Sequence, residues 1–138
     1  MSMGGDFYAL TDAQLRRLLE GDLPYGDFLY DGSSEQPREC LSRFEHLWYE
    51  LSQVLADENT CGVEQSDAVP EMCGYSFSQD VSQTAKMMEI LHEATVRDRC
   101  EARGIESNPV EVWEAVQALT GFYHRAADNN DAILFRVT

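Results

Sequence analysis

Positive charge is scarce in this sequence. Among its 138 residues, ten side chains are basic and 25 are acidic, so the formal net charge is −15, and Lys86 is the single lysine. A surface of this sign repels phosphate backbones and anionic lipid headgroups. The composition therefore excludes nucleic acid and membrane surfaces as partners. It favours either a very soluble protein or one that binds a protein partner with a basic surface.

Long apolar runs are also missing. No stretch approaches the roughly 20 apolar residues that a membrane-spanning helix needs, and the N-terminal region carries no basic segment followed by an apolar core. We therefore expect a cytoplasmic protein. A chain of this length can bury roughly two thirds of the surface that its unfolded form exposes, which suits a single domain over residues 1–138.

Residue patterns that carry catalytic or metal chemistry are absent as well. The four cysteines form no CxxC pair, and we expect four free thiols, two of them on apolar helical faces, with no metal and no cofactor. The three histidines follow no motif spacing: His46, His92 and His124. No catalytic residue is predicted from these patterns.

Local signals are clear at the N-terminal end. Residues 3–10 are aromatic and apolar and predict a strand, in which the opening glycines, including Gly5, allow a close approach or a bulge. Thr11 and Gln14 then form a capping box that starts a helix. Gly21 suits the left-handed residue that ends it.

The remaining chain predicts further helices and one more strand. Apolar residues recur at helical spacing over residues 37–56, Asn108 followed by proline is a helix start, and the run "AILFRV" at 132–137 predicts a strand. Other expected elements are an ordered loop or helical turn over residues 22–36, an acidic loop over 57–71, an extended piece over 73–77, and helices over 78–91 (candidate caps Ser78 and Asp80), 95–104 and 109–128.

A strand at each end with helices between them predicts an α+β fold. We expect one compact domain whose small, mostly antiparallel sheet includes the N-terminal and C-terminal strands and packs against several amphipathic helices. The helical stripes predict a core that contains Phe44, Trp48, Leu51, Trp113, Val116 and Leu119.

Four segments of the chain form a recognisable pattern: "MGGDFYALTDAQLRRLLEGD", "CLSRFEHLWYELSQVL", "YSFSQDVSQTAKMMEIL" and "FYHRAADNNDAILFRVT", of which the first is the most specific. Together they resemble the YfbM-like family, a bacterial domain family of unknown function. The family pattern places a tryptophan and a histidine on the second helix, where Glu45 and Tyr49 stand here. The resemblance implies the fold and a bacterial origin but supplies no catalytic residue. Some small acidic proteins of such families look like immunity proteins encoded beside secreted toxins.

Charge and resemblance together suggest a cytoplasmic immunity protein that neutralises a cognate toxin. Toxins that act on nucleic acids or nucleotides present basic clefts, and an acidic inhibitor is attracted to them. The segment 20–39 combines acids with the aromatic residues Tyr25, Phe28 and Tyr30, a mix that interfaces often use, and the acidic loop 57–71 contains no basic residue. The candidate partner-binding residues in them are Asp22, Asp27, Tyr30, Asp31, Glu58, Glu64 and Asp67. The same acids also fit a solvated face without a partner.

Two other functions stay open on the sequence. A small enzyme would use one of the histidines with a carboxylate or with Cys100, although no spacing specifies such a site. A ligand-binding or oligomeric scaffold protein is a third possibility that the sequence leaves open. A neighbouring toxin gene would favour immunity, and a metabolic operon would favour the enzyme.

Overall fold

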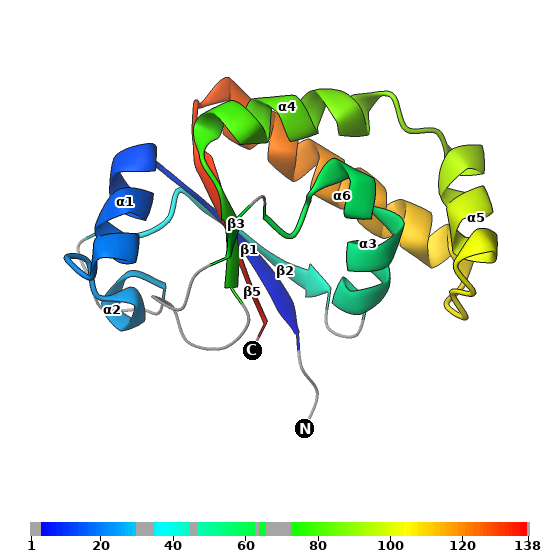
Figure 1. Cartoon of the computed structure of the whole chain (residues 1–138), viewed down its shortest axis with the longest axis horizontal. Helices are drawn as coiled ribbons and strands as arrows, with labels where there is room; N and C mark the ends of the chain where they lie inside the picture. Colours follow the sequence, from blue (N-terminus) through cyan, green and yellow to red (C-terminus); the bar gives the residue numbers. More distant parts are fainter. Residues whose placement is uncertain (1–3, 30–34, 45–46, 63, 66–72, 138) are drawn as a thin grey trace.

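One antiparallel sheet runs through the centre of the molecule (Figure 1). The computed structural model describes residues 4–29, 35–44, 47–62, 64–65 and 73–137. Within these residues, five strands pair in the order β2-β1-β5-β4-β3. Their bounds are Gly5–Leu10 for β1, Glu39–Phe44 for β2, Glu64–Gln65 for β3, Cys73–Ser76 for β4 and Ala132–Val137 for β5.

Helices cover both faces of this sheet and make three layers. Figure 1 shows α1 and α2 on one side of the strands and α3 to α6 on the other. The helices are α1 (Asp12–Glu20), α2 (Tyr25–Leu29), α3 (Trp48–Val54), α4 (Ser78–Glu89), α5 (Glu93–Ala102) and α6 (Pro109–Asp128), with a 3-10 turn, η1, at Ala56–Glu58. Each helix layer encloses its own cluster of buried apolar side chains against the sheet. None of the described helices has the length and apolar character to cross a membrane.

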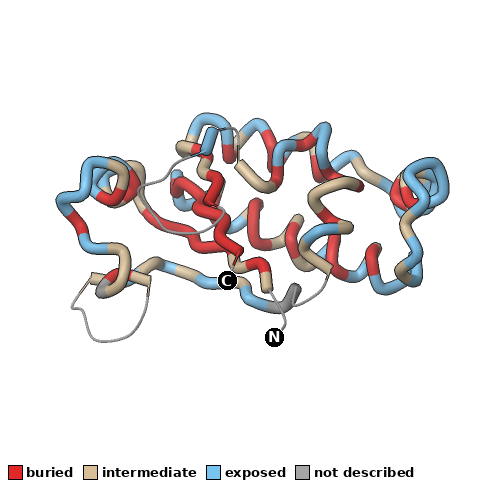
Figure 2. The backbone as a smooth tube through the Cα atoms, turned by 60° about the horizontal axis from the view of Figure 1, so that its bottom comes forward, coloured by how far each residue is buried: buried red, intermediate tan, exposed pale blue. Residues whose placement is uncertain are grey.

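The two terminal strands lie side by side at the centre of the sheet. β1 and β5 are antiparallel, with Gly5 opposite Val137 and Leu10 opposite Ala132. Every residue of β5 is buried, and Figure 2 shows this central part of the sheet as the most enclosed. A strand with both faces covered has no need to alternate apolar with polar residues. The predicted α+β fold, with both ends of the chain in one sheet, is therefore confirmed.

The predicted helix ends are also confirmed where side chains cap them. The Thr11 amide donates to Gln14 Oε1 over 2.9 Å, and the Gln14 amide donates to Thr11 Oγ1 over 3.1 Å, which completes the capping box. Gly21 ends α1 with a φ of 82°. At the start of α6, Asn108 Oδ1 accepts from the Val110 amide over 2.9 Å. These ends are set by residues within one turn of each other.

Gly5 is the first residue of β1 and has both predicted roles, since it lies at a bulge and allows a close approach. The register between β1 and β2 shifts between Gly5 and Phe7, as it does at a β-bulge. A β-carbon on Gly5 would overlap the β-carbon of Trp48 and lie 3.0 Å from Phe135 Cε2. Gly5 therefore lets α3 pack directly onto the end of the central strand.

The helix predicted over residues 37–56 is wrong in its first half. Residues 39–44 form β2, and the helical part begins only at Trp48. β2 pairs with β1, with Tyr8 opposite Cys40, so it supplies hydrogen-bond partners for the outer side of β1. Leu41 packs against the core while Cys40 is exposed, which is the alternation of a strand. The tertiary pairing outweighs the local helical spacing.

Two other helix starts differ from the expectation. Neither Ser78 nor Asp80 caps α4; instead the Ser78 amide and hydroxyl both donate to the carboxylate of Asp12 in α1, over 2.8 and 2.5 Å. The carboxylate of Asp12 therefore lies at the start of α4, where a negative charge is attracted to the positive end of the helix dipole. α5 begins at Glu93, after His92, rather than at residue 95.

The predicted core is confirmed for its aliphatic members and only partly for its aromatic ones. Leu51, Val116 and Leu119 are buried. Trp48 and Trp113 are partly buried and pack against the edge of the cluster. The cost of truncating either tryptophan to alanine should therefore fall below the roughly 3–5 kcal/mol of a fully buried one. The side chain of Phe44 lies outside the described part of the structure.

Candidate functional site

The residues predicted to bind a partner are only partly described. Asp22 follows α1 and is exposed, and Glu64 is exposed in β3. Asp27 lies in α2. Three candidates lie outside the described residues: Tyr30, Asp31 and Asp67.

The prediction that Glu58 is a surface contact is wrong. It is only 5% exposed and lies in η1, where its carboxylate accepts two hydrogen bonds from the guanidinium of Arg99 in α5, at 2.5 and 3.2 Å. Arg99 also donates to the Val54 carbonyl at the end of α3 over 3.0 Å. Arg99 therefore links η1 and the end of α3 to α5 inside one helix layer, and Glu58 is engaged within the molecule. The acidic stretch around Glu58 does not indicate this ion pair, because Arg99 lies 41 residues further along the chain.

The exposed candidates share one side of the sheet. Directly opposite residues of paired strands project to the same face. Glu64 is opposite Tyr75, and Tyr75 packs with the cluster beneath α1 and α2. Asp22 follows the end of α1, and α1 covers that same cluster. We call this the α1–α2 side. Glu58, in contrast, belongs to the layer on the opposite side.

Most arginines of the described residues are already paired with carboxylates within the molecule. Arg17 on the α1–α2 side donates to Glu35 over 2.8 Å, and hydrogen bonds from Arg17 and Gln14 lower the pKa of Glu35. Arg16 lies 5.3 Å above the ring of Phe77. Ion pairs between described residues include Arg17–Glu35, Arg38–Asp131, Arg97–Glu93, Arg99–Glu58, Arg103–Asp57 and Arg125–Glu39. The uncompensated charge of the surface is consequently acidic.

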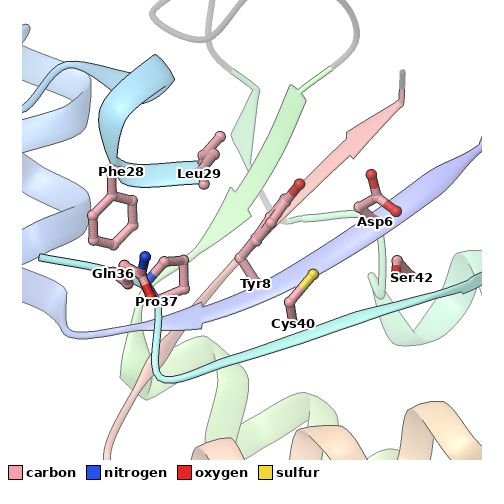
Figure 3. A pocket seen from close by; sticks show the side chains of 8 residues that line it. All are labelled: Asp6, Tyr8, Phe28, Leu29, Gln36, Pro37, Cys40 and Ser42. Atoms are coloured by element: carbon pink, nitrogen blue, oxygen red, sulfur yellow. The ribbon is translucent and has the colours of Figure 1, made fainter. Parts of the chain in front are cut away.

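A cleft of about 370 Å³ opens on the α1–α2 side, between the sheet and α2 (Figure 3). Its floor is formed by neighbouring positions of β1 and β2, since Tyr8 is opposite Cys40 in the register. Figure 3 shows the side chains of the two strands facing α2 and the segment that leads into β2. The lining residues are Asp6, Tyr8, Phe28, Leu29, Gln36, Pro37, Cys40 and Ser42.

The thiol in this cleft is neutral rather than nucleophilic. Cys40 is exposed as a residue, but the cleft removes part of the water around its thiol, and this desolvation raises the pKa of Cys40; the carboxylate of Asp6 raises it further, and the Ser42 hydrogen bond and the charge of Arg136 lower it by less. A thiolate is the reactive form of cysteine, so the site does not activate Cys40. The prediction that places Cys40 on an apolar helical face is wrong, because the residue lies exposed on a strand.

The other cysteines and the histidines are not gathered into a site within the described residues. Cys73 and Cys100 are buried, and burial raises the pKa of Cys61 and of Cys73 to about 11. All four cysteines are free thiols. His92 precedes α5, whereas His124 lies toward the far end of α6 (Figure 1). Across the described ranges, no three histidine, cysteine or acidic side chains are arranged to hold a metal ion.

The fold and the cleft define a class of protein: a three-layer α+β domain with an antiparallel sheet and a negatively charged surface. The chain belongs to the family described as Domain of unknown function (DUF1877), whose model matches residues 1–136. It is similar to the crystal structure of YfbM, a protein of unknown function from Escherichia coli, with a TM-score of 0.66 and 14% identity over 98% of this chain and 99% of that one. At that identity the similarity shows the fold alone. The YfbM-like resemblance is thereby confirmed. A search of curated proteins found no match.

Proposed function

We propose that this protein is a cytoplasmic immunity-type protein that binds a basic surface on a cognate bacterial toxin through the α1–α2 side of its sheet. One observation supports the proposal: ion pairs within the molecule engage most of the described arginines, and the formal net charge of −15 leaves a large excess of acidic over basic side chains. Such an excess accelerates encounter with a basic cleft and disfavours acidic partners.

The described partner-binding residues of the proposal belong to three segments. Asp22 follows the end of α1, Asp27 lies within α2, and Glu64 lies in the edge strand β3. Tyr30, Asp31 and Asp67 remain proposed contacts from the sequence. Glu58 is withdrawn, since it is engaged by Arg99.

The test is to co-express the product of the neighbouring gene with variants of this protein. The double variant Asp22→Lys and Glu64→Lys changes two exposed acids of the α1–α2 side. The matched control Glu101→Lys and Glu114→Lys makes the same change of net charge on exposed positions of α5 and α6, in the opposite layer. We expect the first variant to associate about tenfold more slowly, with weaker salt dependence, and to lose protection, while the control protects.

Three outcomes would contradict the proposal. Full protection by a folded and abundant Asp22→Lys and Glu64→Lys variant would mean that these acids are only solvated. Equal losses in both double variants would mean that net charge acts without a defined surface. Failure of any neighbouring gene product to bind the wild-type protein would remove the immunity function itself.

A further inference from the structure

We propose that β2 and the cleft beside it bind an extended segment of a partner protein, which adds to the sheet as a further strand and carries a large apolar residue flanked by basic ones. This inference goes beyond the proposed function and does not rest on it. Three features support it: the place of β2 at one end of the sheet, the firm attachment of that strand, and the cleft on one of its faces.

β2 is the terminal strand at one end of the sheet. Its inner edge pairs with β1, and within the described residues no strand pairs with its outer edge. Such an edge presents backbone N–H and C=O groups to which another chain can bond. Regular pairing is expected over Glu39, Cys40 and Leu41, because the register with β1 shifts beyond them. The opposite end of the sheet offers only the two residues of β3, so β2 is the longer edge.

The start of β2 is firmly attached to the rest of the molecule. The Arg38 amide donates to the Ala9 carbonyl over 2.8 Å, and Arg38 Nε donates to the buried Asp131 over 2.7 Å. The carboxylate of Glu39 accepts from Arg125 Nη2 in α6 over 2.6 Å. A strand that is already ordered loses little conformational freedom when a partner pairs with it.

The cleft lies on the α1–α2 face of this strand, because Cys40 is opposite Tyr8 and Tyr8 packs with the cluster beneath α1 and α2. Every second side chain of an added strand projects to that face. A large side chain next to Cys40 reaches the cleft, since directly opposite neighbours lie only about 4.5–5.5 Å apart. Phe28 and Leu29 of α2 line the same cleft, whose volume of about 370 Å³ is enough for one large apolar side chain (Figure 3). Sheet edges with an adjoining pocket bind peptides in this way: backbone hydrogen bonds give affinity and the pocket selects a side chain.

The charge of the molecule selects between the two possible sources of such a strand. A second copy of this chain carries the same net charge of −15 and is repelled, whereas a segment with lysine or arginine is attracted. The ion pairs at the start of β2 are balanced, so this preference comes from the whole molecule rather than from one side chain. The occupant is therefore a segment of another protein.

The probe is the fluorophore-labelled peptide acetyl-KTVTFTVTK-amide, and its binding is measured by fluorescence anisotropy at low ionic strength. Two N-methylated forms carry methyl groups on either the odd-numbered or the even-numbered amides, which block one edge of the peptide or the other. A third form replaces the phenylalanine with alanine, and a fourth replaces both lysines with glutamate. Cys40 reports the location, because it is exposed beside the cleft and its modification by iodoacetamide is followed by mass spectrometry.

One N-methylated form should lose at least about tenfold in affinity while the other stays within about twofold of the parent, since only one edge of an added strand faces β2. The alanine form should bind about tenfold more weakly. The glutamate form should also bind about tenfold more weakly, and added salt should reduce this difference. Saturating parent peptide should slow the modification of Cys40 at least about threefold, as expected for a strand that covers its edge.

The variant Leu29→Ala tests the pocket. It should weaken the phenylalanine peptide about threefold and leave the alanine peptide unchanged, because only the former places a large side chain in the cleft. The control Ile90→Ala changes an exposed apolar residue that follows α4 and should affect neither peptide. A general loss of structure in Leu29→Ala would weaken both peptides alike.

Equal effects of the two methylation patterns, tighter binding of the glutamate form, or no binding of any peptide up to about 1 mM would overturn the proposal. Binding without protection of Cys40 would also overturn it, because the peptide would then lie elsewhere. A dimer of the protein alone that protects Cys40 would assign this edge to a second copy. The peptide comparison uses the wild-type protein and no neighbouring gene product, so its failure and a failure of the proposed immunity function are distinguishable.

Discussion

Replacing Glu58 with alanine should destabilise the protein without any partner present. Removing one member of a buried ion pair costs about 3–5 kcal/mol when the remaining charge has no other contact. Arg99 is 20% exposed and keeps its hydrogen bond to the Val54 carbonyl, so part of its charge is recovered by water and by that carbonyl. We therefore expect a loss of about 2–3 kcal/mol in the free energy of unfolding. For a domain of this size, that loss lowers Tm by about 6–9 °C.

The assay is urea unfolding followed by circular dichroism for wild type, Glu58→Ala, Arg99→Ala and the double variant. The double-mutant cycle should give a coupling energy of about 1–3 kcal/mol between the two residues. Glu64→Ala, at an exposed acid of β3, is the matched control and should stay within about 0.5 kcal/mol of wild type. A Glu58→Ala variant as stable as wild type would refute the internal role. A stable variant that had lost partner binding would return Glu58 to the interface.

Three further predictions concern the glycines and the thiols. Gly5→Ala should lower the free energy of unfolding by about 1–3 kcal/mol in thermal or urea unfolding, because the added β-carbon overlaps a tryptophan of α3. The control Gly26→Ala has open space around it and should not destabilise the protein. Equal effects at both sites would contradict the packing. Burial raises the pKa of Cys61 and Cys73 from 9.0 to about 11. Between pH 9 and pH 11 the folded protein therefore keeps thiol protons that the unfolded chain loses. The free energy of unfolding should fall in this range by about 1.4 kcal/mol per pH unit for each thiol. Urea unfolding at pH 8 to 11 measures this fall, and a flat profile would exclude it. Finally, the pH profile of alkylation at Cys40 should report a pKa above that of an ordinary thiol, and a value at or below the ordinary one would be inconsistent with the burial described.

The acidic composition does not determine which of the acidic side chains lie at the surface. Asp22 and Glu64 are exposed as expected. Glu58 stands in an equally acidic stretch, yet it is buried against Arg99. Whether a carboxylate is solvated or paired depends on which arginine the fold brings to it, and that arginine is distant in sequence.

The elements that the sequence by itself determined are those whose signals are local. The strand before Thr11, the capping box, the glycine end of α1, the Asn108 cap and the apolar last strand depend on residues within about one turn or one strand of each other. The order of the elements, with a strand at each end and helices between them, also predicted that the two terminal strands belong to one sheet. Hydrogen bonds between near neighbours in the chain and the apolar composition of the terminal strands were sufficient to predict these elements.

Only the tertiary structure decided the identity of β2, the burial of Glu58 and the existence of the cleft. Residues 39–44 have a helical spacing of apolar side chains, but β1 needs hydrogen-bond partners on its outer side, and this segment supplies them. That pairing sets Cys40 beside Tyr8, and α2 then brings Phe28 over them. The cleft is therefore built from three segments whose contacts no local pattern encodes, because the free energy that selects them comes from pairing and burial between residues far apart in the chain.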